Sequence, residues 1–339
     1  MSSKDRVTRL FKKEETDRVP CFSGMGNVTT TGLDELGYKF AQVHLDAKQM
    51  AETAVTTPKL FGFDSCVLPF DLCVEAEALG AVINTYPHSE DLLYPTIKEK
   101  VIKNEDEMEI SVPEDLVGRG RVPLMHEAIG IAKKEAGGEI PVGSYVLGPF
   151  TLAGQIMELN DLLKLSFKKA DKVGKLLEIL SGVIVKVAKV YEDAGIDFIT
   201  VREMGATSDV LSPRVFKNLI LPHLQNIIKE LNVPSVVHVC GKTNDIVGFM
   251  MESGADAISV DQKNDITETR KKLGNDALVF GNFDPYNVLV AGTPDLIREA
   301  ITKCIDDGVS AVWPGCDIWP TVPPENFKAM IDTVKEHRR

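Results

Sequence analysis

The sequence predicts an α/β fold, a (β/α)8 TIM-type barrel that occupies residues 1–339 as a single domain with N-terminal helical additions. Two observations predict this class. Short apolar runs alternate with segments of helical period, which is typical of parallel strands joined by right-handed crossovers. The number of strand–helix units is about eight, the number that closes such a barrel. The predicted strands lie near Val19, Cys66, Val142, Phe198, Val236, Ala257, Val279 and Ala311.

An open, doubly wound sheet is the competing architecture. It is less favoured because no glycine-rich fingerprint follows the first predicted strand, over residues 19–23. The chain has 339 residues and a hydrophobic content of 44%, so it is long and apolar enough to bury a large core.

The elements predicted in the N-terminal half are irregular in length and spacing. A Gly-Met-Gly-Asn turn over 24–27 opens a polar loop, and residues 89–103 are predicted to form a loop with a helical turn or two. The other expected elements are a charged helix over 4–15, a strand over 19–23, a helix over 42–62, strands over 63–70 and 80–86, an interrupted helical segment over 105–136, a strand over 140–146 and a helix over 150–159.

The second half has a more regular alternation. A long helical period over 168–194 stops at Gly195, and the strand after it ends at Arg202 and Glu203. The remaining strands are expected over 197–201, 235–239, 257–260, 277–280 and 310–313. The remaining helices are expected over 213–231, 244–253, 266–273, 293–307 and 324–337.

Composition excludes several functional classes. The net charge of -12, with a pI near 5.1, argues against a nucleic-acid-binding protein. The six cysteines are scattered rather than arranged as a disulfide framework. The N-terminus is charged, and no apolar run is long enough to predict a signal peptide or a membrane span. We therefore expect a cytoplasmic protein that binds neither nucleic acid nor a membrane.

Three soft ligands follow the ends of two predicted strands. His238 and Cys240 are two residues apart at the end of strand 235–239, so their side chains share a face, and Cys316 follows strand 310–313. Buried cysteines are commonly core residues, but these positions lie where parallel strands of a barrel meet. A His-Cys-Cys set with an open fourth position is typical of catalytic zinc. A structural zinc site would need a fourth ligand, which Glu203 could supply.

Other polar residues are expected at the same end of the barrel. Glu203 and Asp261 are the candidate catalytic residues, although Glu203 could instead pair with Arg202, and Asp261 could accept a hydrogen bond from His238. Asn282 is a substrate-binding candidate that could equally shape its Gly-Asn turn. The full set of substrate-binding candidates is Arg202, Asn282, Trp319 and Asn27. Cysteines elsewhere are expected to pack in the core, namely Cys21, Cys66, Cys73 and Cys304.

Several motifs resemble the uroporphyrinogen decarboxylase superfamily over essentially the whole chain. They are the Pro-Phe-Thr-Leu-Ala-Gly run over 149–154, the Leu-Ser-Pro helix entry over 211–213 and the Gly-Asn-Phe-Asp-Pro turn over 281–285. Within it, His238 and Cys240 with the Gly-Cys pair ending at Cys316 resemble the methylcobamide:coenzyme M methyltransferase branch. The resemblance implies a (β/α)8 barrel whose zinc is held by these three residues. It also implies methyl transfer from a methylcobamide on a small corrinoid protein to the thiol of coenzyme M.

Three alternatives remain at this stage. Arg202-Glu203-Met204-Gly205 stands where the coenzyme M enzymes have an Asp-Pro type turn, so tetrahydrofolate is an alternative methyl acceptor. Uroporphyrinogen decarboxylation is disfavoured because no arginine occurs between Arg18 and Arg119, where carboxylate-binding arginines are needed. The third alternative is a non-catalytic barrel in which zinc has only a structural role and holds strand ends together. No Asp-x-His-x-x-Gly corrinoid signature is present, so the corrinoid is expected on a partner protein.

Overall fold

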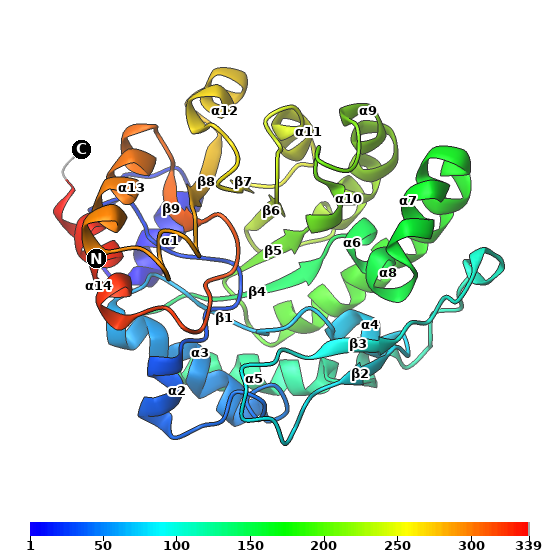
Figure 1. Cartoon of the computed structure of the whole chain (residues 1–339), viewed down its shortest axis with the longest axis horizontal. Helices are drawn as coiled ribbons and strands as arrows, with labels where there is room; N and C mark the ends of the chain where they lie inside the picture. Colours follow the sequence, from blue (N-terminus) through cyan, green and yellow to red (C-terminus); the bar gives the residue numbers. More distant parts are fainter. Residues whose placement is uncertain (338–339) are drawn as a thin grey trace.

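The computed structural model describes residues 1–337, and its centre is a curled, parallel, seven-stranded sheet with helices on the outside (Figure 1). The strand order is β1-β4-β5-β6-β7-β8-β9, so strands that follow one another in this sheet are also neighbours in space. These strands are β1 (Cys66–Val67), β4 (Val142–Leu147), β5 (Phe198–Arg202), β6 (Ser235–Val239), β7 (Ala257–Val260), β8 (Leu278–Phe283) and β9 (Ala311–Pro314).

The first predicted strand, over 19–23, forms a bridge rather than a full strand. Cys21 pairs with Val312 of β9 in a parallel bridge, and the Phe22 amide donates to the Val312 carbonyl at 3.1 Å. On the other side, the amide of Asp64 donates to the Cys21 carbonyl at 2.9 Å. This segment therefore lies between β9 and the residues leading into β1, while the other predicted strand positions fall in the sheet.

Helices follow most of the sheet strands, as the alternating pattern predicts. Several begin at side chains that accept a hydrogen bond from the first turn, as Asp46, Ser212, Asp265 and Thr293 do. The helices are α1 (Ser3–Phe11), α2 (Thr30–Leu36), α3 (Ala47–Phe61), α4 (Val74–Ala78), α5 (Val122–Glu135), α6 (Pro149–Ile156), α7 (Leu159–Lys168), α8 (Ala170–Asp193), α9 (Pro213–Val215), α10 (Leu221–Ile228), α11 (Val247–Glu252), α12 (Ile266–Leu273), α13 (Pro294–Asp306) and α14 (Pro324–Glu336). Short 3-10 turns cover Glu105–Glu107, Leu116–Gly118 and Met204–Ala206, and a π-helical turn, Phe216–Ile220, joins α9 to α10.

Several predictions in the N-terminal half are wrong. The polar loop predicted to open at 24–27 contains helix α2, and only Cys66–Val67 of the strand predicted over 63–70 forms a strand. The segment predicted as a loop over 89–103 contains strand β3 (Thr96–Glu99), which pairs antiparallel with β2 (Val82–Asn84). The segment predicted as mostly helical over 105–136 is an α-helix only from Val122 onward. The sequence of β3, Thr-Ile-Lys-Glu, lacks the apolar alternation that marks a half-buried strand, and its side chains are exposed or half-buried.

Aromatic side chains fill the space enclosed by the sheet. Phe22, Phe280 and Trp313 are fully buried, with the Phe22 and Trp313 ring centroids 4.9 Å apart and the Phe280 and Trp313 rings stacked at 5.4 Å. The interior is therefore a packed core rather than a channel. Among the described residues, no helix combines the length and apolarity needed to cross a bilayer.

Glu75 of α4 is a buried carboxyl that makes stability depend on pH. Its Oε1 accepts a hydrogen bond from the Leu147 amide at 2.9 Å, and burial raises its pKa from 4.5 to about 7. A raised folded-state pKa means that the carboxyl's contribution to stability is fully present below pH 4.5 and is lost as the pH rises through about 7.

We therefore expect Glu75→Gln, which keeps the accepting oxygen, to reduce the drop in melting temperature between pH 5 and pH 8. Thermal unfolding of wild type and variant at both values measures this. Glu127→Gln, at an exposed position on α5, is the matched control and should leave the wild-type drop unchanged. An equal drop in wild type and Glu75→Gln would contradict the assignment.

Candidate metal centre

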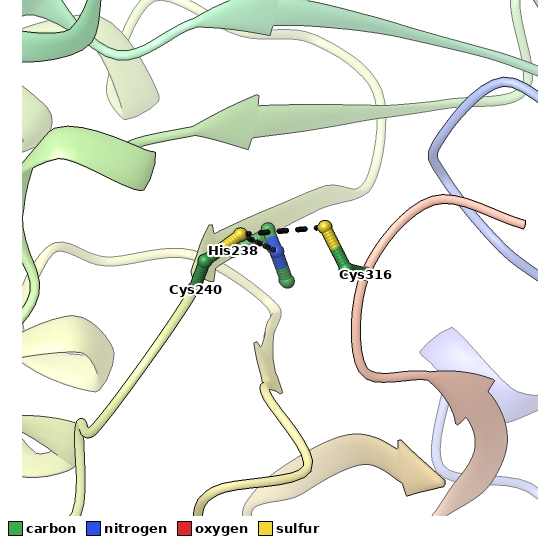
Figure 2. A group of neighbouring side chains, drawn as sticks. All are labelled: His238, Cys240 and Cys316. Carbon is green, nitrogen blue, oxygen red and sulfur yellow. Dashed lines mark hydrogen bonds between the residues drawn. The ribbon is translucent and has the colours of Figure 1, made fainter. Parts of the chain in front are cut away.

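His238 and Cys240 come from the carboxyl end of β6, and Cys316 comes from the loop that follows β9. Along β6, Val237 and Val239 belong to the core cluster packed with the helices, whereas Val236 belongs to the enclosed interior. Because side chains alternate along a strand, His238 points to the same side as Val236. Figure 2 shows Cys240 and Cys316 approaching each other beside the His238 ring.

The three side chains converge on one point. The Sγ atoms of Cys240 and Cys316 are 3.7 Å apart, and His238 Nε2 lies 3.1 Å from Cys240 Sγ. One ligand atom from each residue lies within 4.8 Å of the other two, and no second such group occurs among residues 1–337. His238 is fully buried, while the two cysteines are half-buried. One nitrogen and two sulfurs in this arrangement fit a soft or borderline divalent cation such as Zn²⁺.

The two thiols interact with each other. Their hydrogen bond lowers the pKa of Cys316 and raises the pKa of Cys240. The contact with His238 also lowers the pKa of Cys316. A lowered thiol pKa favours the thiolate, which is the form that binds a cation.

Ser259 of β7 orients the His238 ring. Its Oγ lies 3.0 Å from His238 Nδ1, and both side chains are fully buried. The prediction that Asp261 accepts a hydrogen bond from His238 is wrong, because Nδ1 faces Ser259 and Nε2 faces Cys240. Ser259 is the β7 residue in register with His238, whereas Asp261 lies past the end of the strand and its carboxylate accepts from the Lys263 amide.

Glu203 caps helix α6. Its carboxylate accepts hydrogen bonds from the amides of Phe150 and Thr151, at 2.9 and 2.8 Å, and from Thr151 Oγ1 at 2.6 Å. Burial raises the pKa of Glu203 to about 7, and the hydrogen bonds from the helix oppose that rise. The alternative prediction of an ion pair with Arg202 is wrong, because the Arg202 guanidinium binds Asp317 instead.

The amides of Asn282 and Asn27 are hydrogen-bonded to the backbone. Asn282 Nδ2 donates to the carbonyls of Asn264 at 2.7 Å and Asp261 at 3.2 Å, which shapes the turn after β7. Asn27 is fully buried, and its Oδ1 accepts from the Val67 amide at 2.9 Å. Both side chains thus hold the ends of strands in place.

A cavity of about 790 Å³ opens beside the thiol group of Cys316. Its walls are mostly apolar, and the β3 residue Ile97 forms part of one side. Trp319 is 52% exposed and also lines the cavity, where its ring centroid lies 5.1 Å from that of Tyr286. Sequence reasoning found Trp319 and Cys316 but missed Ser259, whose position opposite His238 depends on strand register.

The sequence model of uroporphyrinogen decarboxylase (URO-D) matches residues 2–337. The chain belongs to this family. Two curated relatives are each 31% identical: the methylcobamide:CoM methyltransferase MtaA of Methanosarcina barkeri, with 98% of both chains covered, and MtbA of Methanosarcina acetivorans, with 99% of this chain and 98% of the relative covered. A solved methyltransferase from Methanosarcina mazei superposes with a TM-score of 0.93 at 28% identity, covering 99% of each chain. The family resemblance predicted from the sequence is confirmed.

Proposed function

We propose that this protein is a methyltransferase that moves a methyl group from a methylcobamide on a small corrinoid protein to the thiol of coenzyme M. The observation that carries the proposal is the convergence of His238, Cys240 and Cys316 at the edge of a largely apolar cavity. The names of the full-length relatives support the same donor and acceptor.

We further propose that His238, Cys240 and Cys316 hold Zn²⁺. The ion would lower the pKa of a thiol bound at its open fourth position, so that the thiol would bind as thiolate and release its proton to solvent. Two cysteine thiolates and a neutral imidazole would balance the charge of the ion, so the acceptor sulfur would keep its own negative charge and its nucleophilicity.

The chain's own residues orient and shield the reacting groups. Ser259 fixes the His238 ring through Nδ1 and leaves Nε2 turned toward the sulfurs. The apolar cavity wall keeps water from the thiolate, which would otherwise be solvated and less reactive. In the transfer the thiolate forms a carbon–sulfur bond, and the electron pair of the broken cobalt–carbon bond stays on cobalt.

The alternative functions receive less support. Glu203 and Asn282, which would assist proton transfer to tetrahydrofolate, are engaged with the α6 N-terminus and with backbone carbonyls. For uroporphyrinogen decarboxylation, no lysine or arginine is present among the described residues that line the cavity. We also infer that the seven strands and the segment over 19–23 form one closed (β/α)8 barrel domain that covers the chain.

The test is to offer methylcobalamin to the purified protein with each acceptor separately. We expect methyl-coenzyme M as the product, measured by mass spectrometry, together with the spectrum of demethylated cobalamin. Little transfer to tetrahydrofolate should occur. Transfer to tetrahydrofolate by a metal-free preparation, with none to coenzyme M, would overturn the proposal.

A further inference from the structure

A buried cation lies on the strand next to β6, at the residue in register with His238. Arg202, the last residue of β5, is 1% exposed, and its guanidinium carbon lies 4.7 Å from the centroid of the Tyr145 ring. Its Nη1 donates to Asp317 Oδ1 at 3.0 Å, and Nη2 donates to the other carboxylate oxygen. The Nε–H has no hydrogen-bond partner within residues 1–337. A buried guanidinium with an unused donor is costly unless a ligand or water completes its contacts.

The carboxylate that binds Arg202 belongs to the cavity wall. Asp317 follows Cys316 directly, lines the cavity and has a side chain that is 35% exposed. It lies in the irregular segment between β9 and α14 rather than in a strand or helix. Asp317 can therefore turn toward solvent without disturbing the sheet, whereas Arg202 is held by β5 and by Tyr145.

The charges around the cavity limit where an anion can bind. Among the described residues that line the cavity, Asp71 and Asp317 carry charged side chains, and none is a lysine or arginine. The carboxylate of Asp71 is already held by both terminal nitrogens of Arg121, at 2.6 and 2.9 Å. An anionic ligand near Cys316 would thus need the guanidinium of Arg202.

We propose that Arg202 determines acceptor specificity by binding the anionic group of a short thiol, and that Asp317 occupies the guanidinium until that group replaces it. This inference rests on the proposed function and specifies its acceptor class. The planar guanidinium fork donates to two oxygens of a sulfonate as readily as to two of a carboxylate. Asp317 Oδ2 lies 3.9 Å from Cys316 Sγ. A ligand whose acid group replaces the Asp317 carboxylate therefore needs only a short spacer to place its thiol sulfur at the candidate metal centre.

The experiment compares an anionic acceptor with a neutral one of similar length. Methyl transfer from methylcobalamin is measured with 2-mercaptoethanesulfonate and with 2-mercaptoethanol, in wild type, Arg202→Lys and Asp317→Asn. We expect Arg202→Lys to reduce the ratio of kcat/KM for the sulfonate to kcat/KM for the alcohol by about 10- to 100-fold, chiefly through KM. A loss of this size is typical when a charge-assisted bidentate contact is removed. Asp317→Asn should lower KM for the sulfonate, because the competing carboxylate is gone.

Controls separate this result from misfolding and from failure of the proposed function. Arg6→Lys weakens another buried ion pair, with Asp64, and should leave the ratio unchanged. Ethanesulfonate, which has no thiol, is titrated by calorimetry into wild type and Arg202→Lys; weaker binding to the variant supports the anion site even if neither thiol is methylated. The proposal falls if Arg202→Lys preserves both the ratio and ethanesulfonate binding. It also falls if Asp317→Asn raises the preference for the sulfonate while Arg202→Lys leaves that preference unchanged, since Asp317 would then simply repel anions.

Discussion

Replacing Cys240 with alanine is expected to reduce methyl transfer from methylcobalamin to coenzyme M by more than about a hundredfold. This exceeds the loss that is typical when a residue that only contacts a metal ligand is substituted. The substitution removes the sulfur that lies 3.1 Å from His238 Nε2 and 3.7 Å from Cys316 Sγ. Two donors would remain, too few to hold Zn²⁺ and generate a thiolate at neutral pH.

The measurement is the initial rate with saturating coenzyme M, accompanied by proton release on thiol binding. Wild type should release about one proton per site because the acceptor binds as thiolate, and Cys240→Ala should release none. Cys304→Ala is the matched control, since it removes a buried sulfur of α13 that is not one of the three candidate ligands. A Cys240→Ala enzyme that retains most of the wild-type rate would contradict thiol activation at this site. If tetrahydrofolate were the acceptor, Glu203→Gln should instead cause the larger loss, about 10²- to 10⁴-fold.

Metal content should follow the three ligand positions. Wild type is expected to bind about one zinc per chain, and Cys316→Ala or His238→Ala to lose it, because each removes one of three converging donors. Elemental analysis after dialysis against a weak chelator measures this. Equal zinc in wild type and Cys316→Ala, or none in either, would show that the ligand assignment is wrong.

Substituting residues next to the ligands should not abolish zinc binding. Ser259→Ala removes the partner of His238 Nδ1, so we expect a 10- to 100-fold weaker zinc affinity, roughly the size seen for such contacts. Asp261→Ala should bind zinc as wild type does, because its carboxylate accepts from the Lys263 amide. Complete metal loss in Asp261→Ala would identify Asp261 as a ligand.

The convergence of His238, Cys240 and Cys316 could be predicted from the sequence because it depends on strand geometry. Alternation along β6 places His238 and Cys240 on one side, and parallel strands bring the end of β9 to the same edge of the sheet. The strands of the sheet were predictable because a strand that is buried on both faces appears in the sequence as a short, continuous apolar run. The β2–β3 pair was missed because β3 is exposed and carries no apolar alternation.

The sequence by itself determined which residues could bind a metal and at which end of the sheet they lie. Tertiary structure decided the partner of each polar side chain. Ser259 rather than Asp261 contacts His238, Glu203 caps α6, and Arg202 binds Asp317, 115 residues away along the chain. Strand periodicity fixes the direction of a side chain only within the strand. Beyond its end, the partner depends on how distant loops pack and on which buried charge each group must neutralise.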